Sequence, residues 1–285
     1  MNPWLLALRP KTLSAAVVPV LIGSALASHI DWLIFAFALS GALFIQIGTN
    51  FVNDALDYKK GADTSERLGP IRVTQAGLLN ADVVLRAAFV CFALAGLCGV
   101  PLIIRGGWPI AIIGVASIIA AYAYTGGPYP LAYNGLGELF VMIFFGFVAV
   151  GGSYYVQMRS IDAAVAVAGF AAGSLACVLL TINNLRDIES DRASNKRTMA
   201  VRFGERFARF EVAFFALAPF LAFSLVADLR GHSWMLLPLA AAFLALELVK
   251  RVYSSRGRDL NRCLALAGAM QWLAGILFAI GTRVP

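Results

Sequence analysis

Two segments of the chain combine carboxylates, amides and basic side chains at spacings that suit the binding of a polyanion. They are Asn53–Gly77 (NDALDYKKGADTSERLGPIRVTQAG) and Asn183–Thr198 (NNLRDIESDRASNKRT). In a helix, Asn53, Asp54 and Asp57 would share one face, and Asn183, Asp187 and Asp191 would form a second polar stripe. Carboxylates on one face repel each other when all are ionised, so we expect divalent cations between them. Mg2+ is typically held by one or two carboxylates plus substrate phosphates, so two opposed faces predict a clamp for a diphosphate.

Basic residues follow both acidic motifs and complete this prediction. Guanidinium and ammonium groups neutralise phosphate oxygens and stabilise the charge on a departing diphosphate. Asp63 follows Gly61, so we expect its carboxylate to return to the site from a loop. The alternative for the basic residues is that they satisfy membrane topology without any chemistry. The predicted diphosphate ligands are Lys59, Arg67, Arg72, Lys196 and Arg197.

Composition indicates which solvent surrounds these motifs. Of the 285 residues, 60% are hydrophobic and 14% are charged, whereas soluble domains carry about 25% charged residues. The net charge of +7 arises from basic residues between apolar segments, which indicates topology rather than nucleic-acid binding. The N-terminal residues do not resemble a cleaved secretory signal, and the four cysteines show no metal-binding spacing.

The apolar segments predict an all-α polytopic membrane protein, a single integral-membrane domain over residues 1–285. A spanning helix needs roughly 17–25 apolar residues. We expect about nine spans, at 12–30, 32–52, 83–104, 108–124, 134–157, 162–182, 210–228, 232–249 and 262–281.

The distribution of Lys and Arg predicts how these spans are oriented. With the N-terminus in the cytoplasm, 19 of the 23 basic residues fall on the inner side, and Arg105, Arg159, Arg230 and Arg283 fall outside. Positive residues concentrate in cytoplasmic loops. We therefore expect a multi-pass inner-membrane protein whose two acidic motifs face the cytoplasm.

The two motifs resemble those of the UbiA superfamily of intramembrane prenyltransferases, which carry N-D-x-x-D-x-x-x-D after the second helix and D-x-x-x-D after the sixth. Asn53, Asp54 and Asp57 match the first motif, and Asp187 and Asp191 match the second. The usual fourth position is Gly61 here, and the next acid is Asp63. The shifted pattern, the ERLGPIRVTQAG stretch, LRPKT (Leu8–Thr12) and KRTMAVRFG (Lys196–Gly204) are similar to the branch that prenylates 1,4-dihydroxy-2-naphthoate in menaquinone biosynthesis.

The resemblance implies a helical bundle around a central apolar chamber and a site that uses two Mg2+ ions to bind a polyprenyl diphosphate. The metal ligands that the resemblance implies are Asn53, Asp54, Asp57, Asp187 and Asp191. The loop and helix geometry adds Asp63 and Asn183 as expected metal ligands, and the expected catalytic set is Asp54, Asp57, Asp187 and Asp191. An allylic cation would form in the chamber, the naphthoate ring would attack it, and CO2 would leave. The resemblance implies no obligate protein partner.

Arg9 and Tyr124 are weaker candidates for contact with the aromatic acceptor. Arg9 precedes the first span and would hold the carboxylate of the acceptor or the diphosphate, although interfacial anchoring explains it equally well. Tyr124 ends the fourth span on the same side and resembles a tyrosine–threonine position of the family. An interfacial aromatic belt is the alternative for Tyr124.

Two other functions stay open at this stage. Another enzyme of the same superfamily would use the same metal site with 4-hydroxybenzoate or homogentisate as acceptor. A cation-coupled secondary transporter would also carry intramembrane acids, but transporter sites lie near the bilayer midplane on broken helices. The acids here lie at helix ends beside basic clusters, which favours an anionic phosphate ligand.

Overall fold

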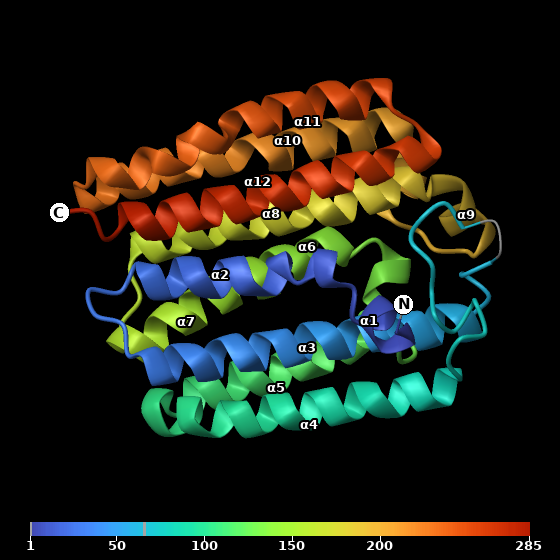
Figure 1. Ribbon diagram of the computed structural model, residues 1–285, viewed down its shortest axis with the longest axis horizontal. Coiled ribbons are helices and arrows are strands. Elements are labelled where there is room, and N and C mark those ends of the chain that lie inside the picture. The colour runs from blue at the N-terminus through green and yellow to red at the C-terminus, as the bar shows by residue number, and fades with distance from the viewer. Residues whose placement is uncertain (1, 65–66) are drawn as a thin grey trace.

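The computed structural model describes residues 2–64 and 67–285, and every regular element in these ranges is helical. The helices lie side by side along the long axis, and the connecting loops gather at its two ends (Figure 1). In the first half they are α1 (Pro3–Leu8), η1 (Pro10–Thr12), α2 (Ser14–Ala25), α3 (Trp32–Lys59), α4 (Ala81–Gly106), α5 (Trp108–Ala123), η2 (Leu131–Asn134), α6 (Gly137–Val141), η3 (Met142–Val148) and α7 (Ala149–Met158). The second half holds α8 (Ala163–Arg186), α9 (Ile188–Ala193), α10 (Met199–Arg230), η4 (Ser233–Ala241), α11 (Ala242–Ser254), η5 (Gly257–Asp259) and α12 (Leu260–Gly281).

The all-helical membrane architecture is confirmed, although the count of continuous spans is lower than nine. Each of the nine predicted segments contains helix. Within the described ranges, six helices are long and apolar enough to cross a membrane: Trp32–Lys59, Ala81–Gly106, Gly137–Met158, Ala163–Arg186, Met199–Arg230 and Gly257–Gly281.

The other three predicted segments are interrupted or short. The first belongs to a pair of helical pieces, Pro3–Thr12 and Ser14–Ala25, bent by 46°. The break between them falls at Leu13, and within the first piece Arg9, with a φ of 54°, separates α1 from η1. The fourth, α5, has 16 residues. The eighth is divided between η4 and α11, and Pro238 within η4 lacks the N–H that an α-helical bond needs.

The helix α8 is the central element of the second half. It packs against α2, α7, η3, α10 and α12, and 78% of its most apolar window is buried. Small residues allow this packing: a Cβ on Gly146 of η3 would lie 2.6 Å from the backbone oxygen of Gly169 in α8. Around this close contact the chain widens into the π-helical turn η3 (Met142–Val148), and such π-bulges occur often at functional sites.

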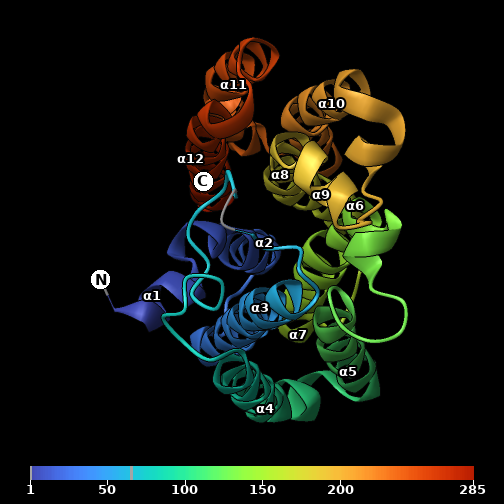
Figure 2. The same cartoon turned by 90° about the vertical axis from the view of Figure 1, so that its right-hand side faces the viewer.

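The helices form a ring of neighbours when seen from the end that carries the two polar motifs (Figure 2). The C-terminal ends of α3 and α8 point toward the viewer, and the loop after α3 and the short helix α9 lie in front of them. The fold therefore brings both motifs, which are about 130 residues apart in sequence, to one end of the bundle.

Candidate active site

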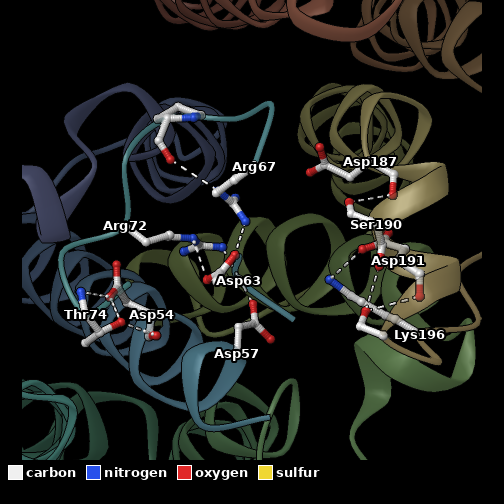
Figure 3. A network of polar contacts seen from close by, with 12 residues as sticks. Asp54, Asp57, Asp63, Arg67, Arg72, Thr74, Asp187, Ser190, Asp191 and Lys196 are labelled. Atoms are coloured by element: carbon white, nitrogen blue, oxygen red, sulfur yellow. Dashed lines mark hydrogen bonds and ion pairs between the residues drawn. The ribbon is translucent and has the colours of Figure 1, made fainter. Parts of the chain in front are cut away.

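A polar cavity of about 510 Å3 lies between the two motifs. Both motifs contribute to its wall, together with residues from the first, fifth and last helical spans. The sequence-predicted residues in the wall are Arg9, Asn53, Asp57, Asp63, Arg67, Arg72, Tyr124, Asn183, Asp187, Asp191 and Lys196. Figure 3 shows the two sets facing each other, with Asp57 and Asp63 on one side and Asp187 and Asp191 on the other.

The first half of the site is an acid–base network around Asp63. As the sequence predicted, α3 continues to Lys59, and Asp63 returns from the loop that follows. Arg67 binds the Asp63 carboxylate, and Arg72 lies 3.3 Å from Asp63 and 3.6 Å from Asp57. Tyr133 of η2 donates a hydrogen bond of 2.9 Å to Asp57. Two guanidinium groups thus hold the carboxylates at the rim of the cavity.

Asp54 has different surroundings from the other motif acids. Its side chain is buried and accepts hydrogen bonds from the backbone N–H of Val73 (3.3 Å), the N–H of Thr74 (3.0 Å) and the Thr74 hydroxyl (2.5 Å). Arg9 lies 3.9 Å away. Asp54 is not among the described residues that line the cavity. Its contacts anchor the loop that carries Arg72.

The second half of the site departs from the predicted geometry. Asn183, Asp187 and Asp191 were expected along one helix, but α8 ends at Arg186 and α9 begins at Ile188. Asp187 stands between the two helices with φ −101° and ψ 14°. Arg186 stabilises this break, because its buried guanidinium donates to both oxygens of Asp187 at 2.7 and 2.6 Å. The prediction of a continuous stripe was therefore wrong, although all three side chains line the cavity.

Asp191 faces the cavity from α9 and is paired with Lys196, whose Nζ lies 3.7 Å from the carboxylate. Burial raises the pKa of Asp191 to about 6, and burial likewise raises the pKa of Asp63 to about 6. In each case the buried carboxylate oxygen Oδ2 accepts no hydrogen bond among the described residues, although Asp63 Oδ2 forms an ion pair of 3.3 Å with Arg72 Nε. Burial destabilises the charged form of a carboxylate, and a cation bound at the oxygen would offset this cost, above all at Asp191 Oδ2.

These acids fit a divalent cation that takes the rest of its ligands from a substrate. Among the described residues, no three acidic, histidine or cysteine side chains lie close enough together to hold an ion on their own. The carboxylates of Asp63 and Asp191 instead lie in opposite walls of the cavity. Mg2+ bound through one or two carboxylates and phosphate oxygens requires no larger protein cluster.

Two of the predicted diphosphate ligands lie outside the cavity wall. Lys59 pairs with Asp82 of α4 at 2.5 Å, and both side chains are exposed. Arg197 is exposed, and its backbone N–H binds the carbonyl oxygen of Tyr133. Glu66 of the ERLGPIRVTQAG stretch lies outside the described residues.

Several wall residues were missed by the sequence reasoning. Arg186 also donates 2.8 Å to Asn261 of α12, and the Asn261 amide donates 3.0 Å to the carbonyl oxygen of Leu68. This chain of bonds ties the loop after α3 to the far half of the bundle. Asn184 donates 2.7 Å to the buried Glu138 of α6. Arg186 could have been found from its place beside Asp187, but Asn261 has no signal in its local sequence.

A second cavity, of about 280 Å3, extends from the polar one into the apolar interior. It lies between α2, α3, α4, α5 and the helical segment from α6 to α7. Both cavities share five wall residues: Gln46, Thr49, Tyr124, Val141 and Phe145. A polar site that opens into an apolar chamber suits an amphiphilic ligand with an anionic head and a hydrocarbon tail.

Comparison with known proteins places this arrangement in context. The sequence model of the UbiA prenyltransferase family matches residues 16–275. A 1,4-dihydroxy-2-naphthoate octaprenyltransferase of Escherichia coli strain K12 is 37% identical, over 98% of this chain and 94% of the relative. One of the same name from Haemophilus influenzae is 34% identical, over 100% of this chain and 96% of the relative.

Solved structures support the fold. A UbiA homolog from Archaeoglobus fulgidus bound to DMAPP and Mg2+ superposes with a TM-score of 0.68, at 12% sequence identity, over 98% of this chain and 100% of that one. At this identity the likeness concerns the fold alone.

Proposed function

The chain belongs to the UbiA prenyltransferase family, and on that premise we propose that it transfers a polyprenyl group from an isoprenyl diphosphate to 1,4-dihydroxy-2-naphthoate. CO2 is lost and a demethylmenaquinone is formed in its reduced, quinol state, as one step of menaquinone biosynthesis. The observation that carries this proposal is the pair of naphthoate octaprenyltransferases that are 34% and 37% identical over nearly the whole chain. The joined polar and apolar cavities support it independently.

The donor diphosphate binds between the two halves of the polar cavity. Arg67, Arg72, Arg186 and Lys196 are the basic residues of the two motifs that line this cavity. Arg186 is already bound to both oxygens of Asp187, so Arg67, Arg72 and Lys196 are the ones whose charges attract the phosphate oxygens. Guanidinium groups form paired, charge-assisted hydrogen bonds with phosphate. Lys59 and Arg197 lie outside the cavity wall and take no part in the proposed diphosphate site.

Mg2+ fits the carboxylates described above. Asp57, Asp63, Asp187 and Asp191 would hold it, with the amides of Asn53 and Asn183 beside them, and two ions would correspond to the two walls. When bound, the ions supply positive charge that offsets the charge developing on the leaving diphosphate. We assign Asp54 to positioning the loop that carries Arg72.

The reaction follows from the polarity of the two cavities. The allylic C–O bond breaks, and its electron pair leaves with the diphosphate, which the basic residues hold. The allylic carbon lies at the junction, where the apolar wall excludes water that would otherwise capture the cation. The electron-rich naphthoate ring forms the new C–C bond, and the bond to the carboxylate then breaks to release CO2 and return its electrons to the ring.

The acceptor approaches from the side of Arg9 and Tyr124. Arg9 lines the polar cavity, and its guanidinium lies 3.4 Å from the carbonyl oxygen of Asn50. It has donors left for the naphthoate carboxylate. Tyr124 lines both cavities, so its ring is available to pack beside the allylic cation.

The membrane provides the surroundings for this reaction. The helices make the chain a multi-pass membrane protein, and we propose that it lies in the inner membrane with its N-terminus and active site facing the cytoplasm. The bias of basic residues toward one side supports this orientation. Its partners are the polyprenyl diphosphate, the aromatic acceptor and the lipid bilayer, and we propose no nucleic acid and no obligate protein partner.

The test uses purified protein in lipid, Mg2+ and a radiolabelled all-trans polyprenyl diphosphate. 1,4-Dihydroxy-2-naphthoate and 4-hydroxybenzoate are supplied in parallel reactions. Lipid-soluble product is expected with the naphthoate alone, and EDTA or Asp187→Ala should abolish it. Glu189→Gln is the matched control, because Glu189 lies on α9 with an exposed side chain that does not line the cavity.

Each other outcome would change one part of the proposal. Product with 4-hydroxybenzoate instead would replace the acceptor and keep the mechanism. Activity that survives EDTA would refute the dependence on Mg2+. No product with either acceptor, and no binding of the diphosphate, would refute prenyl transfer and favour cation-coupled transport.

A further inference from the structure

The buried acid Glu138 has no role in the diphosphate and metal sites described above. It lies in the first turn of α6, it is 8% exposed, and it lines the polar cavity. A carboxylate within a membrane-spanning segment is costly, and such acids usually mark a functional site. Its surroundings indicate which part of a substrate it would meet.

Glu138 lies close to the junction of the two cavities. Val141 and Phe145 follow it in the same span, and both line the polar and the apolar cavity. A Cβ on the neighbouring Gly137 would lie 3.1 Å from the hydroxyl oxygen of Tyr124, which also lines both cavities. Glu138 is therefore near the place where the allylic carbon and the aromatic ring would meet.

The acids in the wall of the polar cavity differ in whether a basic side chain holds them. Glu138 is the one acid in this wall that forms no ion pair among the described residues. The acids of the wall that pair with arginine or lysine are Asp57, Asp63, Asp187 and Asp191. A positive neighbour favours the ionised form of a carboxylate and makes it a weaker base. An unpaired carboxylate is better suited to take up a proton.

One oxygen of Glu138 is available to a ligand in the cavity. The Asn184 amide donates 2.7 Å to Oε1 and fixes the orientation of the carboxylate. No side chain among the described residues donates to Oε2. A base that a second residue orients, with its other oxygen free, is the usual arrangement of a general base.

The chemistry of the acceptor requires such a base. When a ring carbon of a hydroxynaphthoate forms a bond to the allylic carbon, the neighbouring hydroxyl becomes a carbonyl and must lose its proton. Water that could take this proton would also capture the allylic cation, so the site must exclude it. A carboxylate of the protein resolves this conflict.

We propose that Glu138 is the general base of the transfer and that its Oε2 accepts the proton of the acceptor hydroxyl next to the prenylated carbon. This inference rests on the proposed function, because it takes the acceptor to be the dihydroxynaphthoate. As the O–H bond breaks, its electron pair forms the carbonyl, and a pair from the ring forms the new C–C bond. The proton moves to Glu138.

The same residue then completes the reaction. The intermediate holds its carboxylate β to the new carbonyl, an arrangement from which CO2 is readily lost. The electron pair of the broken C–C bond passes to the ring and the carbonyl oxygen, and that oxygen takes the proton back from Glu138. The carboxylate of Glu138 is restored, and no proton is gained or lost overall.

Glu138→Gln tests this role, because glutamine keeps an oxygen for Asn184 and cannot take up the proton. We expect kcat to fall by about 100-fold or more, which is the usual contribution of a general base. KM for the donor and for the acceptor should stay within about threefold of wild type. Glu189→Gln on the exposed face of α9 is the matched control and should keep wild-type kcat. Wild-type kcat in Glu138→Gln would refute the proposal.

The pH profile separates a base from a residue that only positions the acceptor. An aromatic hydroxyl has a pKa of about 10, so alkaline buffer ionises part of the acceptor before it binds. The ratio of wild-type to Glu138→Gln kcat should shrink from about 100 near pH 7 to about 10 or less near pH 9.5. A ratio that stays constant would indicate positioning and overturn the proposal. The other titratable groups close enough to interact with Glu138 are Tyr124, Cys177, Lys196 and Glu211, and they are the same in both proteins.

A second experiment uses only the wild-type protein and remains informative if the variant does not fold. Two acceptor analogues each carry one methyl ether, 1-hydroxy-4-methoxy-2-naphthoate and 4-hydroxy-1-methoxy-2-naphthoate. The first keeps the proton next to the carboxylate-bearing carbon and should be prenylated, whereas the second has no proton there and should not react. Equal turnover of both, or turnover of neither, would overturn the assignment of the proton. Turnover of the dihydroxynaphthoate itself shows in every case that the proposed function stands.

Discussion

Thr74→Val tests whether Asp54 acts by positioning the loop between α3 and α4. The Thr74 hydroxyl donates 2.5 Å to the Asp54 carboxylate and also lies 2.8 Å from the Asp54 carbonyl oxygen. Both residues are buried. Valine keeps the shape and removes this donor, while the backbone N–H groups of Val73 and Thr74 still reach Asp54.

The expected magnitude follows from the type of bond that is lost. A hydrogen bond to a charged group contributes about 1.5–3 kcal/mol. Because two backbone donors remain, we expect a loss near 1.5 kcal/mol, the lower end of this range. Such a loss shifts the equilibrium between the attached and the detached loop by roughly tenfold toward the detached form. Arg72, two residues before Thr74, would then be displaced from Asp57 and Asp63. The apparent affinity for the donor falls in proportion to the fraction of molecules with the loop in place.

Two assays report on this shift independently. Donor-dependent kinetics should show a decrease in kcat/KM of up to about tenfold, with Thr74→Ser close to wild type because serine keeps the hydroxyl. Limited trypsin digestion should cleave after Arg67 or Arg72 faster in Thr74→Val, since these arginines lie in the loosened loop. If Thr74→Val matches Thr74→Ser in both assays, the hydroxyl does not hold the loop, and the positioning role of Asp54 is refuted.

Three further predictions concern single contacts. Lys59→Met should leave kcat/KM within about twofold of wild type, since exposed ion pairs contribute about 0–1 kcal/mol. Lys196→Met should lower kcat/KM by more than about tenfold, because it removes a charged contact to the diphosphate. Equal losses in the two variants would show that Lys59 also binds the diphosphate. Asn261→Leu removes the bridge between Arg186 and the carbonyl oxygen of Leu68, so KM for the donor should rise while kcat changes little, as steady-state kinetics would show. Glu138→Leu leaves the Asn184 amide unpaired in a buried position and should lower the free energy of unfolding by about 1–3 kcal/mol, measured by thermal melting in detergent. Glu138→Gln retains an acceptor and its stability should stay near wild type. Similar melting of the two variants would contradict this reasoning.

Much of the site was predictable because it is encoded locally. The spacing of Asn53 and Asp57 places both on one face of a helix wherever that helix lies, and α3 continues through them. The apolar segments identify the helices because backbone hydrogen bonds must be satisfied inside lipid. The return of Asp63 from a loop also follows from the local sequence, since Gly61 adopts a φ of 71° just after α3 ends.

Other features depend on contacts between residues that are distant in sequence. Helical periodicity predicted that Asp187 continues a stripe, but the bonds from Arg186 to Asp187 and to Asn261 stabilise a break there. Asp54 and Asp57 have the same residue type and lie three positions apart, yet one binds Thr74 and the other lines the cavity. No local pattern distinguishes them, because the difference arises from where a loop some 20 residues later folds back.

The sequence by itself determined the membrane class, the helical segments and the acidic and basic motifs, because hydrophobicity and helix spacing act over short distances. Only the tertiary structure decided which of these side chains share a cavity. It removed Lys59 and Arg197 from the wall and added Arg186, Asn261 and Glu138. It also decided where helices touch at glycine, as Gly48 does against Phe92 and Gly275 against Val18. Such packing depends on the shapes of surfaces that meet only after the helices have assembled.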